Sequence, residues 1–339
     1  MVRLCTAWLK ASFIQLPSIT IGREMSTGVA EYYGQRTDAL TPIHPVDIPY
    51  TGWSPEKPIP LCPFSGGNTC KKLKAKNEPV CSVRDQDGVL WISCSERLCS
   101  TKKDVPLCSH QKEILTMTAR HIFDGGIDPS DVCVKREESL RVSEGSAYHA
   151  DFIITTRSGE SSTSGPNRLV LEMQGGGETS DTGKITQRVR KWKNTTENER
   201  TNEQLRAETT ANALVTNAWR RQQEQFLIKG NIAMKTWKGL GIAFCVGTLL
   251  YDYLMERLDS VNLPNLKDYN WTLALLAFKE DKSRPVEDGP IPLTIDEDRT
   301  LYTNYQTFVQ ALINQGQPTL EAFQGQFCSL ENERIDIPF

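Results

Sequence analysis

The fold is decided by two strand-like runs, His149-Ala-Asp-Phe-Ile-Ile-Thr-Thr156 and Arg168-Leu-Val-Leu-Glu-Met-Gln174. Residues 157–167 between them are rich in Ser, Gly, Thr, Pro and Asn, a composition that predicts a hairpin loop. Because residues two apart in a strand share a face, Glu172 and Gln174 project together from an otherwise apolar strand. If the two runs pair as a hairpin, Asp151 lies beside them.

Asp151, Glu172 and Gln174 are therefore the candidate catalytic residues. Two carboxylates and an amide that converge in this way suit a divalent metal that activates water against a phosphodiester. Gln174 holds a position that a lysine often fills in such nucleases, and its neutral amide would hydrogen-bond the nucleophile without adding charge. The alternative for each residue taken singly is a strand cap or a side chain at a solvated sheet edge.

Outward from the hairpin, helix-like and strand-like segments alternate. A helical pattern begins at Ser109, others cover residues 202–229, 248–258 and 302–314, and strand-like runs cover 240–246 and 271–278. This interleaving predicts an α/β (α+β) fold with a mixed β-sheet flanked by helices.

The composition is that of an ordinary globular protein. The 339 residues are 38% hydrophobic and 24% charged, with a net charge of −3. No apolar run is long enough to span a membrane, so we expect no membrane partner. A nucleic-acid partner would need locally concentrated positive charge, because the chain as a whole is slightly acidic.

We expect three segments along the chain. Residues 1–24 are mildly apolar, and we interpret them either as an upstream extension before Met25 or as a dispensable arm. Residues 25–108 would form an N-terminal arm and a cysteine module, and residues 109–339 the core.

Cysteines are distributed unevenly. Of the ten in the chain, six fall between residues 62 and 108. A cluster at one end of a long chain favours a metal-binding module in a reduced compartment over a disulfide framework. Four thiolates can enclose one tetrahedral zinc or iron ion, and the candidate ligands are Cys62, Cys70, Cys81 and Cys94. The alternatives are Cys99 as a ligand beside Cys94, and buried free thiols that pack as small apolar residues.

Positive charge is concentrated after the second strand. Five basic residues lie within ten positions that contain no acidic residue, namely Lys184, Arg188, Arg190, Lys191 and Lys193. Contact with DNA phosphates is the functional interpretation, and a solvated helix face is the alternative. The long helical segment adds Arg220, Arg221 and Gln225, which are of the types that read base edges.

The cysteines and the acidic residues together resemble a known family. The segments Cys62-Pro-Phe64, Cys70, Val80-Cys-Ser-Val83 and Trp91-Ile-Ser-Cys94 resemble the iron-binding four-cysteine module of the NotI restriction endonuclease family. Asp151 followed by Leu171-Glu-Met-Gln174 is similar to that family's active site, a variant of the PD-(D/E)XK nuclease motif with glutamine in place of lysine.

The resemblance implies a type II restriction endonuclease with a PD-(D/E)XK core that cuts both strands of a GC-rich palindrome in double-stranded DNA. It implies a homodimer, a Mg²⁺ ion bound by Asp151 and Glu172, and Gln174 in the third active-site position. It also implies structural iron or zinc on the four cysteines, a cognate DNA methyltransferase in the host, and a bacterial cytoplasmic location.

Two other classes of function remain open at the level of sequence. In a DNA-binding regulator the cysteines would form a finger and the acidic face would be incidental. In a redox or iron–sulfur protein the cysteines would carry the chemistry, which leaves the pattern at Asp151 and Glu172 without a purpose.

Overall fold

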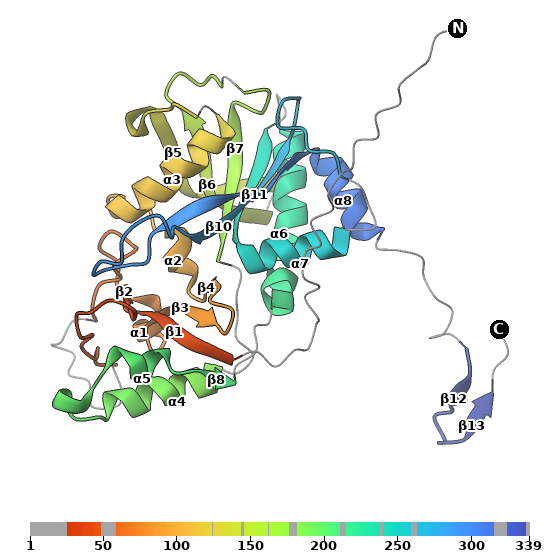
Figure 1. Ribbon diagram of the computed structural model, residues 1–339. Coiled ribbons are helices and arrows are strands. Elements are labelled where there is room, and N and C mark those ends of the chain that lie inside the picture. The colour runs from red at the N-terminus through yellow and green to blue at the C-terminus, as the bar shows by residue number, and fades with distance from the viewer. Residues whose placement is uncertain are drawn as a thin grey trace, which may run out of the picture.

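The computed structural model describes residues 26–48, 59–123, 125–143, 146–161, 163–175, 182–210, 215–236, 240–258, 263–314 and 324–336. The upstream extension expected at residues 1–24 lies outside these ranges. Figure 1 shows a large sheet with helices on its two faces and a smaller sheet below it.

The large sheet has six strands in the order β11-β10-β9-β7-β6-β5. Strands β5, β6 and β7 form an antiparallel meander, β7, β9 and β10 are parallel, and β11 returns antiparallel to β10. Their bounds are β5 Val132–Ser143, β6 Ser146–Thr156, β7 Arg168–Gln174, β9 Gly241–Gly247, β10 Leu273–Glu280 and β11 Leu293–Thr303. The mixed α/β sheet expected from the sequence is confirmed, and the two strand-like runs pair as the hairpin β6–β7.

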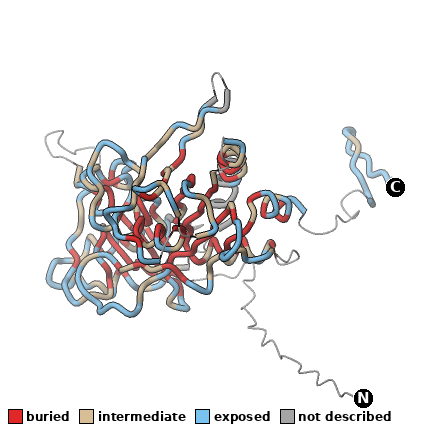
Figure 2. Tube along the Cα trace, turned by 90° about the horizontal axis from the view of Figure 1, so that it is seen from above, coloured by how far each residue is buried: buried red, intermediate tan, exposed pale blue. Residues whose placement is uncertain are grey.

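Each face of this sheet packs against helices. Successive residues along a strand point to opposite faces, so Val170 and Leu171 enter separate cores. One core lies against α2 (Ser95–Cys99) and α3 (Ser109–Ile122), and the other against α6 (Val215–Lys235), α7 (Thr248–Leu258) and α8 (Tyr305–Ile313). Figure 2 shows the buried residues gathered in the interior of the body.

The smaller sheet is built mostly from the N-terminal part of the chain. Its strands follow the order β2-β1-β3-β4, and β8 pairs with β1. Helix α4 packs on it because Ile185, Val189 and Trp192 recur at helical spacing and enter one core with Tyr32 and Val83. The bounds are β1 Ser26–Tyr32, β2 Gln35–Arg36, α1 Lys71–Lys74, β3 Val80–Asp85, β4 Leu90–Ile92, α4 Thr182–Lys193, α5 Asn202–Arg206 and β8 Thr209–Thr210.

The helix expected over residues 202–229 is two helices, so that expectation is wrong. Helix α5 begins after Thr201, whose capping box with Gln204 sets the first turn. It ends at Arg206, and the β-branched pair Thr209–Thr210 then forms β8. Helix α6 begins anew at Val215. Two 3-10 helices, Pro129–Asp131 and Glu197–Glu199, complete the helical elements of the described chain.

A short hairpin near the C-terminus stands apart from the body. Strands β12 (Gln326–Cys328) and β13 (Arg334–Asp336) pair antiparallel and all their residues are exposed. Figures 1 and 2 both show the hairpin separated from the rest of the molecule. Across the described chain, none of the helices combines the length and the apolar character needed to cross a membrane.

A buried ion pair joins the two sheets. Glu31 of β1 and Arg97 of α2 are fully buried, and Arg97 Nε donates to Glu31 Oε2 at 2.7 Å. Ser82 and the backbone N–H of Ile291 also donate to the Glu31 carboxylate, and Arg97 donates to the carbonyl of Ile291. Ile291 leads into β11, so one network connects the small sheet, α2 and the edge of the large sheet.

Replacing Arg97 by Met would leave the buried Glu31 carboxylate without its counter-ion. We expect the free energy of unfolding to fall by about 3–5 kcal/mol, because loss of one partner leaves an uncompensated buried charge. Urea unfolding followed by circular dichroism measures the change. Arg284→Met is the matched control, because it breaks the exposed Arg284–Glu113 pair and should shift stability by less than about 1 kcal/mol. An Arg97→Met protein as stable as the wild type would contradict the role given to the network.

Candidate functional site

Asp151 lies where β6 parts from β7. The ladder between these strands runs from Thr155–Arg168 to Phe152–Leu171. One residue further on, the Asp151 side chain accepts a hydrogen bond from the backbone N–H of Met173 at 2.9 Å. A side-chain oxygen thus takes up the amide just beyond the Phe152–Leu171 pair, while β7 continues to Gln174 by pairing with β9. This places a carboxylate in the opening between two strands.

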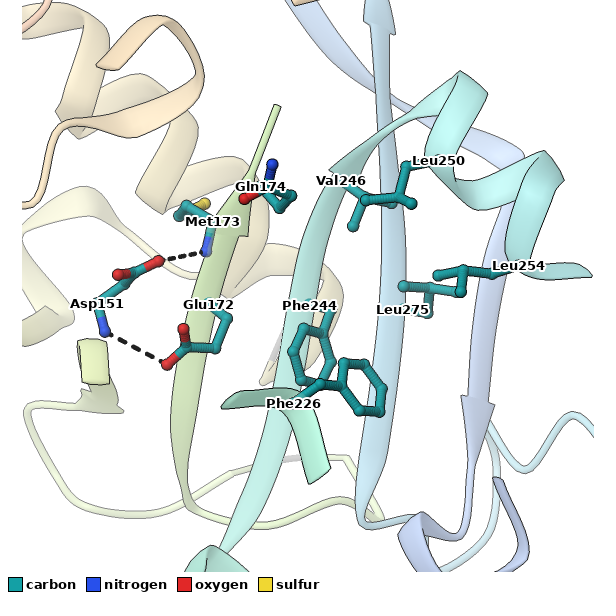
Figure 3. A pocket seen from close by; sticks show the side chains of 10 residues that line it. All are labelled: Asp151, Glu172, Met173, Gln174, Phe226, Phe244, Val246, Leu250, Leu254 and Leu275. Carbon is teal, nitrogen blue, oxygen red and sulfur yellow. Dashed lines mark hydrogen bonds between the residues drawn. The ribbon is translucent and has the colours of Figure 1, made fainter. Parts of the chain in front are cut away.

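Glu172 faces this opening from β7 and is buried. Its Oε1 lies 3.4 Å from the backbone nitrogen of Asp151, which donates to it. Its Oε2 accepts from Lys229 Nζ of α6 at 2.6 Å. Figure 3 shows the Glu172 carboxylate turned toward the backbone nitrogen of Asp151 and the Asp151 carboxylate turned toward the nitrogen of Met173, with both hydrogen bonds marked.

A pocket brings the three predicted catalytic residues together. Asp151, Glu172 and Gln174 all line it, so the convergence inferred from the strand pattern is present in the structure. The rest of its wall is apolar, and comprises Met173, Phe226, Phe244, Val246, Leu250, Leu254 and Leu275. Such a wall lowers the local dielectric and strengthens every charge interaction at the carboxylates.

The carboxyl groups have perturbed acidities. Burial raises the pKa of Glu172 to about 8, the neighbouring Asp151 charge acts in the same direction, and Lys229 opposes both. Burial also raises the pKa of Asp151, against the hydrogen bond from Met173 and the charge of Lys229. A carboxyl that titrates near neutral pH can hold or take up a proton there, which is the property that acid–base chemistry needs.

Lys229 is the site residue that the sequence pattern did not reveal. It lies three residues after Phe226 and four before Ala233, so it occupies the buried face of α6. A lysine on the apolar face of a helix is the signal that could have found it. Gly230 beside it lets α6 approach α8, because a Cβ there would lie 2.1 Å from the Tyr305 ring.

The magnesium site expected from the sequence is wrong. Within the ranges that the structure describes, no group of three or more His, Cys, Asp or Glu residues is placed to hold a metal ion. The donor atoms are engaged within the protein, because Asp151 accepts from Met173 N and Glu172 from Lys229. The side chains therefore do not fit the Mg²⁺ role assigned to Asp151 and Glu172.

The iron or zinc site expected on Cys62, Cys70, Cys81 and Cys94 is also wrong. Among the residues that the structure describes, no group of three or more His, Cys, Asp or Glu side chains could hold a metal ion. All four are buried free cysteines, and three of them pack in one small core with Phe64 and Leu73. Burial raises the pKa of the Cys62 thiol to about 12 and raises those of Cys81 and Cys94 as well. Protonated thiols in an apolar core are poor ligands, because metals bind the thiolate.

The basic stretch lies on α4, and its side chains fall into two groups. Lys193 donates to the Val46 carbonyl and lies 3.6 Å from Glu78, and Arg188 donates to the carbonyl of Glu208, so both hold the fold. The side chains that face solvent are Lys184, Arg190 and Lys191. Arg220, Arg221 and Gln225 lie in the first half of α6, and their side chains fall outside the described part of the chain.

No protein-family model matches this chain, and no curated protein matches it either. The family resemblance therefore stays a prediction carried by the cysteine segments and by Asp151, Glu172 and Gln174.

We expect Asp151→Asn to raise the free energy of unfolding at pH 7 by about 1 kcal/mol, because removal of a buried, repelled charge at a functional site often stabilises the fold. The amide oxygen keeps the hydrogen bond from Met173, while the buried charge that repels Glu172 is lost. Chemical denaturation at pH 7 measures the difference. Asp131→Asn removes an exposed carboxylate and should leave stability unchanged. A destabilised Asp151→Asn protein would show that the charge supports the fold.

Proposed function

We propose that this chain is a sequence-specific endonuclease of the type II restriction class, which hydrolyses phosphodiester bonds in double-stranded DNA. The observation that carries the proposal is the meeting of Asp151 and Glu172 in the opening between β6 and β7. Strand-borne carboxylates held in an apolar wall have fixed geometry, which positioning of an attacking water requires.

The finer fold assignment belongs to the same proposal. A PD-(D/E)XK core would consist of the β5–β6–β7 meander followed by the parallel strands β9 and β10. Its acidic residues would be Asp151 and Glu172, with Gln174 in the third position. The confirmed mixed sheet and the shared pocket support this assignment.

In the proposed reaction the oxygen of one water forms a bond to phosphorus, and the bond from phosphorus to one ester oxygen breaks. One proton of the water ends on the leaving oxygen and the other stays with the new phosphate end. Asp151 and Glu172 would orient the water, and the ionised form of Glu172, which the pairing with Lys229 favours, would take up one proton and pass it to the leaving oxygen.

Lysines paired with carboxylates whose charge reaches the site support DNA as the substrate. Helix α1 and the turn after it carry lysines without an acidic residue at positions 71–76, namely Lys71, Lys72, Lys74 and Lys76. Lys71 lies 3.9 Å from Glu96, and Lys102 donates to Glu137 at 3.0 Å. Both glutamates are near enough to Asp151 for their charges to raise its pKa. Lysines on two segments thus approach the site, where flanking phosphates would lie.

Cleavage of both strands of a palindrome by one kind of site requires two chains related by a two-fold axis. A homodimer is therefore part of the proposal. So are the GC-rich palindromic target, a cognate DNA methyltransferase that protects host DNA, and a bacterial cytoplasmic setting.

Strand cleavage is the direct test. Purified protein is incubated with mixed-sequence and GC-rich plasmids at pH 7, and products are resolved on a gel. We expect discrete fragments from the wild type and a loss of at least about 100-fold in rate for Asp151→Ala and Glu172→Ala. Glu113→Ala, an exposed carboxylate on α3, is the control and should cut normally. Specific binding without cleavage by the wild type would instead favour a DNA-binding regulator.

Backbone contact is tested by salt dependence. The triple variant Lys71→Gln, Lys74→Gln and Lys76→Gln should bind DNA more weakly on every sequence. The slope of log affinity against log salt should fall by about one for each phosphate that the variant no longer neutralises. Arg157→Gln is the control, because Arg157 is exposed about 20 Å along β6 from Asp151 at the ordinary strand rise. An unchanged slope in the triple variant would remove α1 from the DNA surface.

A further inference from the structure

We infer that Lys229 supplies, from helix α6, the positive charge that position 174 of β7 lacks. The inference rests on the proposed nuclease function and concerns a positioning residue that acts through Glu172. It assigns to a helix a group that the strand motif would place two residues after the glutamate.

The location of Lys229 is the first ground. Its Nζ lies 2.6 Å from Glu172 Oε2, both side chains are buried, and its charge also reaches Asp151. A buried ion pair is seldom more stable than an apolar pair of the same volume, because both ions lose their hydration. A lysine kept at this place, beside an otherwise apolar wall, therefore calls for a purpose other than stability.

The rigidity of its surroundings is the second ground. Phe226, one turn earlier on α6, stacks on Phe244 with 3.6 Å between ring centroids. Phe244 is the β9 residue paired with Glu172 itself. With Gly230 seated against Tyr305 on the other side, α6 is held on the sheet at the level of the site. The ammonium group is thus fixed before any substrate arrives.

The geometry of β7 makes the two positions interchangeable. Glu172 and Gln174 share the face covered by α6, and strand residues two apart are about 7 Å from one another. A lysine stem spans a comparable length, so a lysine at 174 would reach the Glu172 carboxylate from along the strand. Lys229 reaches the same carboxylate from helix α6, which covers this face of the sheet. Either origin places one cation beside the two carboxylates.

Chemically, this cation would hold the Glu172 carboxylate ionised and in place beside the attacking water, and it would offset the repulsion between the carboxylates and the phosphate. A preorganised charge in a dry site acts most strongly on the transition state. Its loss should therefore lower the cleavage rate much more than DNA affinity.

Relocation of the charge is the test. Cleavage rate at saturating DNA, DNA affinity and unfolding are compared for wild type, Lys229→Met, Gln174→Lys and the double variant Lys229→Met/Gln174→Lys. Met keeps the apolar stem of the lysine, which favours a folded variant, and Lys229→Gln repeats the measurement with a polar stem. Lys279→Met is the control, because Lys279 pairs with the buried carboxylate of Asp296 at 2.8 Å elsewhere on the sheet, while its own side chain is half-exposed.

We expect Lys229→Met to cut at least about 100-fold more slowly with DNA affinity within about threefold of wild type. The double variant should recover at least about tenfold of that loss, since it returns the charge. A purely structural lysine would not be rescued from position 174. Normal cleavage by folded Lys229 variants, or no recovery in a folded double variant that binds DNA, would overturn the inference and leave the nuclease function standing. Absence of cleavage by the wild type would overturn both.

Discussion

The β6–β7 ladder stops at Phe152 and Leu171, and the site depends on that stop. Beyond it the two strands are joined by two hydrogen bonds to side chains, from the Met173 amide to Asp151 and from the Asp151 amide to Glu172. In the opening that results, Glu172 accepts hydrogen bonds both from the Asp151 amide of β6 and from Lys229 of helix α6. Pairing with β9 keeps β7 straight through the same stretch, so the carboxylates are exposed to each other without loss of a strand.

The Glu31–Arg97 network fixes the position of the small sheet relative to this opening. Because Arg97 belongs to α2, the same helix that carries Glu96 toward Asp151 is anchored to β1 and to the residue leading into β11. Helix α1 is anchored by Leu73, which is buried in the core that holds Cys62 and Phe64, so its backbone is fixed while most of its lysine side chains stay exposed. A substrate that spans both sheets would meet a preformed surface.

Alternation and turn composition predicted the hairpin, the mixed sheet and the convergence of Asp151, Glu172 and Gln174, since all three follow from local backbone periodicity. Lys229 could not be placed in the same way, because its partner is 57 residues away and the contact depends on how α6 docks. The cysteine spacing predicted a metal module, but burial decides whether a thiol is ionised, and burial is a tertiary property. Helix propensity favoured one helix over 202–229, whereas pairing of Thr209 and Thr210 with β1 interrupts it.

Gly230 touches no polar group of the site, yet it fixes how far α6 stands from α8. Any side chain there would meet the Tyr305 ring and push the helix, and Lys229 with it, away from Glu172. Substitutions at Tyr305 or Gly230 would thus change the distance between the Lys229 ammonium group and the Glu172 carboxylate. Selection on activity in this chain would act on a contact between two helices as strongly as on the residues that meet the substrate.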